Sequence, residues 1–411
     1  MRSSHEHLFE QIDLFGAGMR EDPYPVYGDL RESDPVHWDE SMQLWILTRY
    51  DDVAFALSKP QFSSHRIDRG RDRHPQKEFS SLFDTLGGRM SEFDEPDHKR
   101  LRSLVQHAFA RAAVEEWQPF INERVAALLS PIREAGRCDL IEEFAIPLPL
   151  AVILQIVGIP PEDRQQVKLW CDDFSIVALN YLGNISDEEL HRGLVSVSAF
   201  KDYLRERVES LRTSPRRDLL TSLVQAEDGG TRLNLEELLA NALLLLSAGN
   251  ETTTCVIGNG VTALLRNPEQ LALLKSDPSL VPKAVEEILR YDSPVQFLSR
   301  IVAEDIELRG KKLRKGDIVF AVMGAANRDP EKYDDPDNFD ITRHPNPHLA
   351  FGFGHHFCAG SQLARMESIT ALRGFLEQLT DFEIDPDIEL RRQDNFNIRC
   401  FQSLPLKLRV P

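Results

Sequence analysis

The sequence predicts a mainly α-helical fold with a smaller β region, formed by one domain. Three observations predict it. Apolar residues recur with helical periodicity through most of residues 51–292. Short apolar runs bounded by turn residues, typical of strands, occur on both sides of that stretch. The chain also has no internal repeat, no low-complexity segment and no clear linker, so we expect residues 1–411 to form a single domain.

The individual elements follow from these patterns in chain order. Pro23 and Pro25 punctuate the start of the chain, and a turn at residues 315–317 separates two later strands. The predicted strands cover residues 36–38, 44–48, 306–308, 318–322 and 406–410, and the predicted helices cover residues 99–109, 114–135, 186–211, 235–266 and 360–379.

Residues 63–91 differ from the rest of the helical part. Within them, residues 66–77 are dense in charge and poor in apolar periodicity. Long connections of this kind are usually functional or mobile. The segment therefore predicts one long surface loop, with its charged part simply solvated.

Composition excludes several classes of function. The formal net charge of −18 argues against nucleic acid and against an anionic membrane surface as main partners. The N-terminus has no apolar stretch long enough for a signal peptide or a membrane anchor, and apolar runs such as residues 242–246 are too short to span a bilayer. The five cysteines are odd in number and show no CxxC spacing, which argues against disulfide, zinc and iron–sulfur frameworks. We therefore expect a cytoplasmic protein.

The most informative feature is a glycine-rich run at residues 351–360, Phe-Gly-Phe-Gly-His-His-Phe-Cys-Ala-Gly. It holds Cys358 directly before the last predicted helix, where the helix dipole and unpaired N–H groups favour a thiolate and predict a depressed pKa. The glycines let the backbone approach a flat ligand closely. Such a thiolate suits axial ligation of haem iron. The alternative is a buried free cysteine in a loop.

This run resembles the haem-binding signature of cytochromes P450, Phe-Gly-x-Gly-x-x-x-Cys-x-Gly. The resemblance implies that Cys358 is the axial ligand of the iron of haem b (iron protoporphyrin IX), with Phe351, Gly352 and Gly360 beside the cofactor. It also implies the P450 fold, in which the haem lies between a long central helix and the cysteine loop.

The long helix predicted at residues 235–266 contains a polar interruption. Asn234 is a good N-cap and Asn267-Pro268 a stop, and the helix would be roughly 48 Å long. Its middle, residues 248–254, reads Ala-Gly-Asn-Glu-Thr-Thr-Thr. Taken alone, this run is equally compatible with a Glu251 that faces solvent. Because it looks like the P450 motif on the distal haem face, the resemblance implies that Thr252 hydrogen-bonds the activated oxygen and that Glu251 takes part in proton delivery.

Glu287 and Arg290 lie three residues apart, so they share a helix face and can pair. They match the P450 Glu-x-x-Arg motif, whose buried pair has a structural role. In many relatives an arginine from a Pro-x-Arg-Phe segment joins the pair. Here Asn338 stands at that position, so the sequence leaves open whether Asn338 or Arg343 completes the network.

Haem propionates need basic or hydrogen-bonding partners when partly buried. The positions that supply such partners in P450s are matched here by His98, Arg102, Arg300 and His356. His98 and Arg102 are four residues apart and therefore share one helix face.

The resemblance implies a separate source of electrons. The sequence shows no Gly-x-Gly-x-x-Gly motif opening a βαβ unit and no length for a fused reductase. We expect a ferredoxin or flavodoxin with its reductase as partner, docking on the cysteine side. Candidate contacts are Lys99, Arg100, Arg111 and Arg365.

The substrate pocket can be outlined only by family position. Its residues are mostly apolar, which predicts a small hydrophobic or amphipathic substrate of fatty acyl, terpenoid, steroid, macrolide or carrier-bound type. The predicted pocket residues are Phe83, Met90, Phe174, Val177, Tyr181, Leu244, Ser247, Ala248, Val295, Phe297, Phe396 and Ile398.

The leading functional hypothesis is a haem-thiolate monooxygenase that hydroxylates or epoxidises such a substrate in secondary metabolism. One alternative is a haem-thiolate enzyme that couples phenols or forms a ring without inserting oxygen. Another is a haem-binding sensor or carrier without turnover. A peroxide-driven enzyme is disfavoured, because such relatives tend to carry an arginine–proline pair where Glu251 and Thr252 stand.

Overall fold

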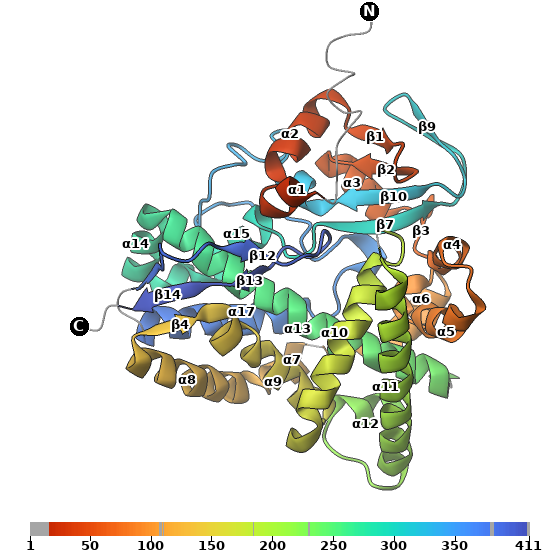
Figure 1. Cartoon of the computed structure of the whole chain (residues 1–411), viewed down its shortest axis with the longest axis horizontal. Helices are drawn as coiled ribbons and strands as arrows, with labels where there is room; N and C mark the ends of the chain where they lie inside the picture. The colour runs from red at the N-terminus through yellow and green to blue at the C-terminus, as the bar shows by residue number, and fades with distance from the viewer. Residues whose placement is uncertain are drawn as a thin grey trace, which may run out of the picture.

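The computed structural model describes residues 16–106, 109, 111–183, 185–228, 231–378 and 382–408. The fold is mainly helical, with the strands gathered in small sheets, so the predicted class is confirmed (Figure 1). The helices are α1 (Ala17–Glu21), α2 (Tyr24–Ser33), α3 (Tyr50–Ser58), α4 (Ile67–Arg73), α5 (Ser80–Gly87), α6 (Asp97–Gln106), α7 (Arg111–Glu115), α8 (Gln118–Ala135), α9 (Pro147–Val157), α10 (Arg164–Asn180), α11 (Asp187–Thr213), α12 (Leu219–Gln225), α13 (Leu235–Arg266), α14 (Pro268–Ser276), α15 (Val281–Tyr291), α16 (Met323–Ala326) and α17 (Ser361–Gln378).

The largest described sheet has the strand order β1-β2-β10-β7-β3, in which only the β2–β10 pair is parallel. It lies at one end of the molecule beside α1 to α3 (Figure 1). The strands are β1 (Val36–Asp39), β2 (Leu44–Leu47), β3 (Phe62–Ser63), β4 (Arg137–Asp139), β5 (Glu227–Asp228), β6 (Thr231–Arg232), β7 (Phe297–Val302), β8 (Ile306–Leu308), β9 (Lys311–Leu313), β10 (Ile318–Val322), β11 (Phe382–Ile384), β12 (Arg391–Arg392), β13 (Phe401–Ser403) and β14 (Pro405–Leu408).

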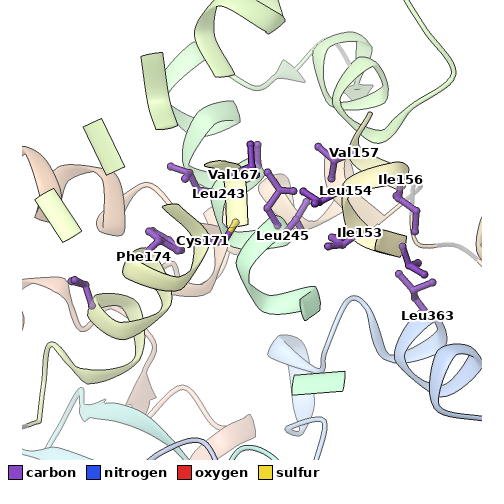
Figure 2. Packing of buried hydrophobic residues seen from close by; sticks show 14 of the residues in the cluster. Ile153, Leu154, Ile156, Val157, Val167, Cys171, Phe174, Leu243, Leu245 and Leu363 are labelled. Atoms are coloured by element: carbon purple, nitrogen blue, oxygen red, sulfur yellow. The ribbon is translucent and has the colours of Figure 1, made fainter. Parts of the chain in front are cut away.

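Helix α13 crosses the middle of the molecule (Figure 1). A reciprocal capping box fixes its start, since Asn234 and Glu237 each accept a hydrogen bond from the other's backbone N–H, at 2.9 and 3.0 Å. Most of its residues are buried, because α9, α10, α15 and α17 pack around it. Figure 2 shows Leu243 and Leu245 of α13 between apolar side chains of α9 and α10. The helix therefore forms the axis of the core.

The segment at residues 63–91 is not one long loop, although most of residues 68–77 are exposed or partly exposed, as predicted for its charged part. It contains α4 and α5, and Phe79, Leu82, Phe83 and Leu86 are buried. These four residues follow helical spacing, so their burial outweighs the charge of the preceding stretch. The prediction of one long surface loop is wrong.

Other boundaries differ by less. The helix expected at residues 114–135 is two helices, because α7 ends at Glu115 and α8 begins at Gln118 with Pro119 in its first turn. Strands β3 to β7, β9 and β11 to β13 have no counterpart among the predicted strands. Residues 107–108, 379 and 409–410, at the ends of predicted elements, and the N-terminal residues 1–15 lie outside the described residues. None of the described helices is long and apolar enough to cross a membrane.

Candidate active site

The cysteine loop leads directly into α17. The Cys358 N–H donates to the carbonyl of Phe351 at 2.9 Å, which closes the loop. Gly352 and Gly354 both have φ of +74°, and a Cβ on Gly354 would lie 2.9 Å from Ser58 of α3. Only glycine fits Gly354 without strain, because its backbone packs directly on α3.

The Cys358 thiol does not have the depressed pKa that its position predicts. Burial raises the pKa above the ordinary thiol value, although the backbone at Gly360 and the charges of Arg102 and Arg365 act in the opposite direction. Desolvation therefore outweighs the helix terminus in the protein alone. A coordinated metal ion would deprotonate the thiol outright, so a thiolate here depends on the metal.

Cationic and imidazole side chains gather beside the loop. The rings of His98 and His356 have centroids 3.9 Å apart, and Arg102 Nη2 donates to the carbonyl of Phe357 at 2.7 Å. Burial, followed by the charge of Arg300, lowers the pKa of His356 to about 2. The structure thus brings His98 and Arg102, neighbours on α6, together with Arg300 and His356, which lie about 200 and 250 residues later in the sequence.

Arg300 is the residue best suited to bind an anionic group. It is buried, and the hydrogen bond it donates goes to the carbonyl of Ser299 at 2.8 Å. Burial, and then repulsion by Arg66, lowers its pKa to about 9. Among the described residues, Arg300 forms no ion pair. A buried guanidinium without a carboxylate fits a haem propionate, so the residues present suit haem.

A buried ionic cluster next to Arg300 was not visible in the sequence. Glu92, at 0% exposure, accepts from Arg66 Nε at 3.2 Å, from Arg89 Nη2 at 2.9 Å and from the Tyr181 hydroxyl at 3.1 Å. Arg66 also reaches Ser299 of β7. The cluster ties the end of α10 to the segment before α6. Apart from Arg89 and Glu92, which lie three residues apart, these residues are too far apart in the chain for a local pattern to signal their contacts.

The polar run of α13 forms a continuous helix. The Thr252 hydroxyl donates to the Ala248 carbonyl at 3.0 Å, one turn earlier. Glu251 is partly buried, and no hydrogen bond holds its carboxyl group among the described residues. Burial, and then the charge of Asp172 of α10, raises the pKa of Glu251 to about 7, although the charge of Lys168 acts in the opposite direction. Glu251 is therefore partly protonated near neutral pH.

The Glu287–Arg290 pair is buried at 0% exposure and bidentate, with N–O distances of 2.8 and 2.7 Å. Both candidates for the third member take part. Arg343 Nε donates to Glu287 Oε1 at 3.3 Å, whereas Asn338 contributes its backbone carbonyl, which accepts from Arg290 Nη2 at 3.1 Å. Asn346 adds a further bond to Glu287 at 3.1 Å. The network is thus complete without an arginine at position 338.

The predicted pocket residues fall into separate groups. Tyr181 packs edge-on against Phe83, while Phe297 stacks on Phe396 at 5.2 Å, and Val295 bridges to Ile398. Phe297, Phe396 and Ile398 line one cavity together with residues of α2, β2 and β10, and none of the other predicted residues lines it. Phe83, Phe174, Val177, Tyr181, Met90 and Ser247 are buried, and Leu244 lies at the edge of the same core. Ala248 is exposed on α13.

The side chains predicted to contact the electron carrier differ in their exposure and in whether they already form an ion pair. Lys99 is exposed, but Arg100 pairs with Glu237 and Arg365 with Glu286. The side chain of Arg111 lies outside the described part of the structure.

Comparison with known proteins agrees with this geometry. The family model "Cytochrome P450" matches residues 188–409. The biotin biosynthesis cytochrome P450 of Bacillus subtilis (strain 168) is 36% identical, covering 93% of this chain and 95% of the relative. Cytochrome P450 monooxygenase PikC of Streptomyces venezuelae is 38% identical, covering 97% and 94%.

A solved structure of P450BioI in complex with an acyl carrier protein ligated to hexadec-9Z-enoic acid matches with a TM-score of 0.89 and 34% identity. The match covers 96% of this chain and 99% of that one. The resemblance seen in the cysteine loop therefore extends over nearly the whole fold. The chain belongs to the cytochrome P450 family and is a cytochrome P450 monooxygenase.

Proposed function

We propose that this P450 binds haem b through Cys358 and hydroxylates or epoxidises a hydrophobic small molecule of secondary metabolism. The observation that carries the proposal is the closed Cys358 loop beside a buried, unpaired Arg300. His98, Arg102, Arg300 and His356 would hold the propionates, and Phe351, Gly352 and Gly360 would lie along the ring. The haem would supply reductive activation of O2 when bound.

Two residues of α13, Glu251 and Thr252, would deliver protons to the active site and orient the group that accepts them. Because its pKa is about 7, Glu251 holds a proton near neutral pH and can give it up. The Thr252 hydroxyl donates its hydrogen bond to the Ala248 carbonyl, so its oxygen can still accept a hydrogen bond in the pocket. Glu251 would thus deliver protons, and Thr252 would orient their acceptor.

The substrate is proposed to be apolar and to enter along an aromatic wall. Phe297 stacks on Phe320 at 4.2 Å and on Phe396 at 5.2 Å, which gives a flat apolar surface. The solved relative that is bound to an acyl carrier protein supports a fatty acyl chain, delivered by a carrier, as one substrate type to test first.

Residues 1–411 would form one haem domain, and electrons would come from a separate ferredoxin or flavodoxin with its reductase, docking on the side of the cysteine loop. Phe353 and Phe357 are exposed beside Cys358, 44% and 38% respectively, and Lys99 is exposed on α6. These residues form a mixed apolar and basic surface suited to an acidic electron carrier.

Turnover in labelled O2 tests the proposal. Purified protein with a surrogate ferredoxin, its reductase and NADPH is offered a palmitoleoyl chain, either free or on an acyl carrier protein. We expect one labelled oxygen atom in the product, and no NADPH consumption when the ferredoxin is omitted. An unlabelled coupled or cyclised product would indicate oxidation without oxygen insertion. Haem binding without substrate-linked NADPH consumption, across acyl, steroid and macrolide substrates, would indicate a sensor or carrier.

A further inference from the structure

Glu286 of α15 makes contacts separate from those of its neighbour Glu287. Its carboxylate binds Arg365 of α17 in a bidentate pair, with Nε–Oε1 and Nη2–Oε2 distances of 2.6 and 2.9 Å. His348 Nε2 lies 3.0 Å from Oε2. Because His348 Nδ1 accepts from the backbone N–H of Ala350 at 3.2 Å, Nε2 carries the proton and donates to Glu286.

This carboxylate is ionised at any physiological pH. Burial alone would raise the pKa of Glu286, but the hydrogen bonds from His348 and Arg365 lower it to about 2. The side chains of Glu286 and Arg365 are 30% and 24% exposed, so water screens the pair only in part. The pair is therefore a fixed, partly desolvated dipole between α15 and α17.

The positive end of this ion pair, Arg365, lies beside the cysteine loop. The Arg365 guanidinium lies over the ring of Phe351, 4.4 Å from its centroid. The backbone carbonyl of Phe351 accepts the hydrogen bond from the Cys358 N–H at 2.9 Å. Phe351 thus connects Arg365 to Cys358 through one stacked ring and one backbone hydrogen bond.

We propose that Glu286 and Arg365 are positioning residues, and that the charge of Arg365, held over Phe351 and balanced by Glu286, sets the reduction potential of the haem at Cys358. The proposal rests on the proposed function, since it requires the haem–thiolate bond. The positive end of the pair faces the loop and favours negative charge there. Adding an electron to the haem adds negative charge, so an unopposed Arg365 raises the potential and its loss lowers the potential.

Charge and geometry are separated by four variants of the haem-loaded protein. Glu286→Gln removes the opposing charge, Arg365→Met removes the positive charge, and Arg365→Lys keeps the charge without the planar stacking. The double variant Glu286→Gln/Arg365→Met restores the net charge. Glu389→Gln is the control, because it removes one carboxylate from an exposed pair with Arg391 whose side chains are 77% and 71% exposed.

The readout is the midpoint potential from spectroelectrochemical titration, with the reduced carbon monoxide spectrum recorded for each protein. We expect Glu286→Gln to raise the potential and Arg365→Met to lower it. Each shift should be on the order of tenfold in the reduction equilibrium constant, about 59 mV for one electron. Arg365→Lys should stay near the wild type, and the double variant should fall between the two single variants.

Potentials that match the Glu389→Gln control, in variants that keep the thiolate spectrum, would overturn the proposal and leave a purely structural ion pair. So would shifts of the same sign in Glu286→Gln and Arg365→Met. If Arg365→Met fails to fold, Glu286→Gln and Arg365→Lys still decide the question. A wild-type protein without the thiolate spectrum would instead refute the proposed function.

Discussion

Glu287→Gln should lower the free energy of unfolding by about 3–5 kcal/mol and prevent stable haem incorporation. Glu287 is buried at 0% exposure and accepts hydrogen bonds from Arg290, Arg343, Asn346 and the backbone N–H of Asp340. A neutral amide would leave two arginines without a counter-charge in the core. Urea denaturation followed by circular dichroism measures the loss.

The control for this prediction has the same spacing on a helix surface. Glu209 and Arg212 of α11 also pair three residues apart, at 2.8 Å, but are 57% and 52% exposed. Glu209→Gln should cost about 0–1 kcal/mol, because water screens exposed pairs. If the two substitutions cost the same, the buried network does not stabilise the fold in the way proposed.

Glu251→Gln should lower the rate of product formation by about 10²-fold and remove a pH step near 7. In the wild type the rate should fall as pH rises through about 7, because only the protonated carboxyl donates. Steady-state product formation between pH 6 and pH 8.5, with a surrogate ferredoxin system, measures both effects. Glu236→Gln on the same helix is the control, since that carboxylate lies in the first turn and pairs with Lys201.

The Tm of Glu251→Gln distinguishes a loss of proton transfer from misfolding of the variant. The folded state raises the pKa of Glu251 from 4.5 to about 7, so it holds the proton more tightly than the unfolded chain. The stability that Glu251 contributes is present at low pH and is lost as pH rises through about 7. Glu251→Gln should therefore have a higher Tm than the wild type at pH 8. A Tm loss together with the rate loss would contradict a specific proton-transfer role.

Local signals in the sequence predict part of the fold well. The bounds of α13 follow from Asn234 and from Asn267-Pro268, and β8 and β10 also have their predicted ends. Capping and turn chemistry act within a few residues, so they can be read along the chain. The single loop predicted for residues 63–91 is wrong because dense charge does not exclude a surface helix such as α4, and because Arg66 pairs with Glu92, 26 residues later.

In the candidate site, too, local contacts can be predicted from the sequence and distant contacts cannot. Helical spacing pairs Glu287 with Arg290, but the contribution of Arg343 depends on a backbone turn 56 residues away. The Glu286–Arg365 pair spans 79 residues and has no local signature. The raised pKa of the Cys358 thiol could not be predicted either, because a helix terminus can be inferred from sequence while the depth of burial cannot.

We propose that Cys358 ligates the haem iron as a thiolate. The most direct test is the absorption spectrum of the reduced protein with carbon monoxide, recorded for the wild type and for Cys358→Ser. Cys171→Ser serves as the control, because Cys171 is a buried free cysteine of α10. A strongly red-shifted Soret band in the wild type and the control, lost in Cys358→Ser, is the predicted result. Folded wild-type protein without haem, or with an unshifted band, would contradict it.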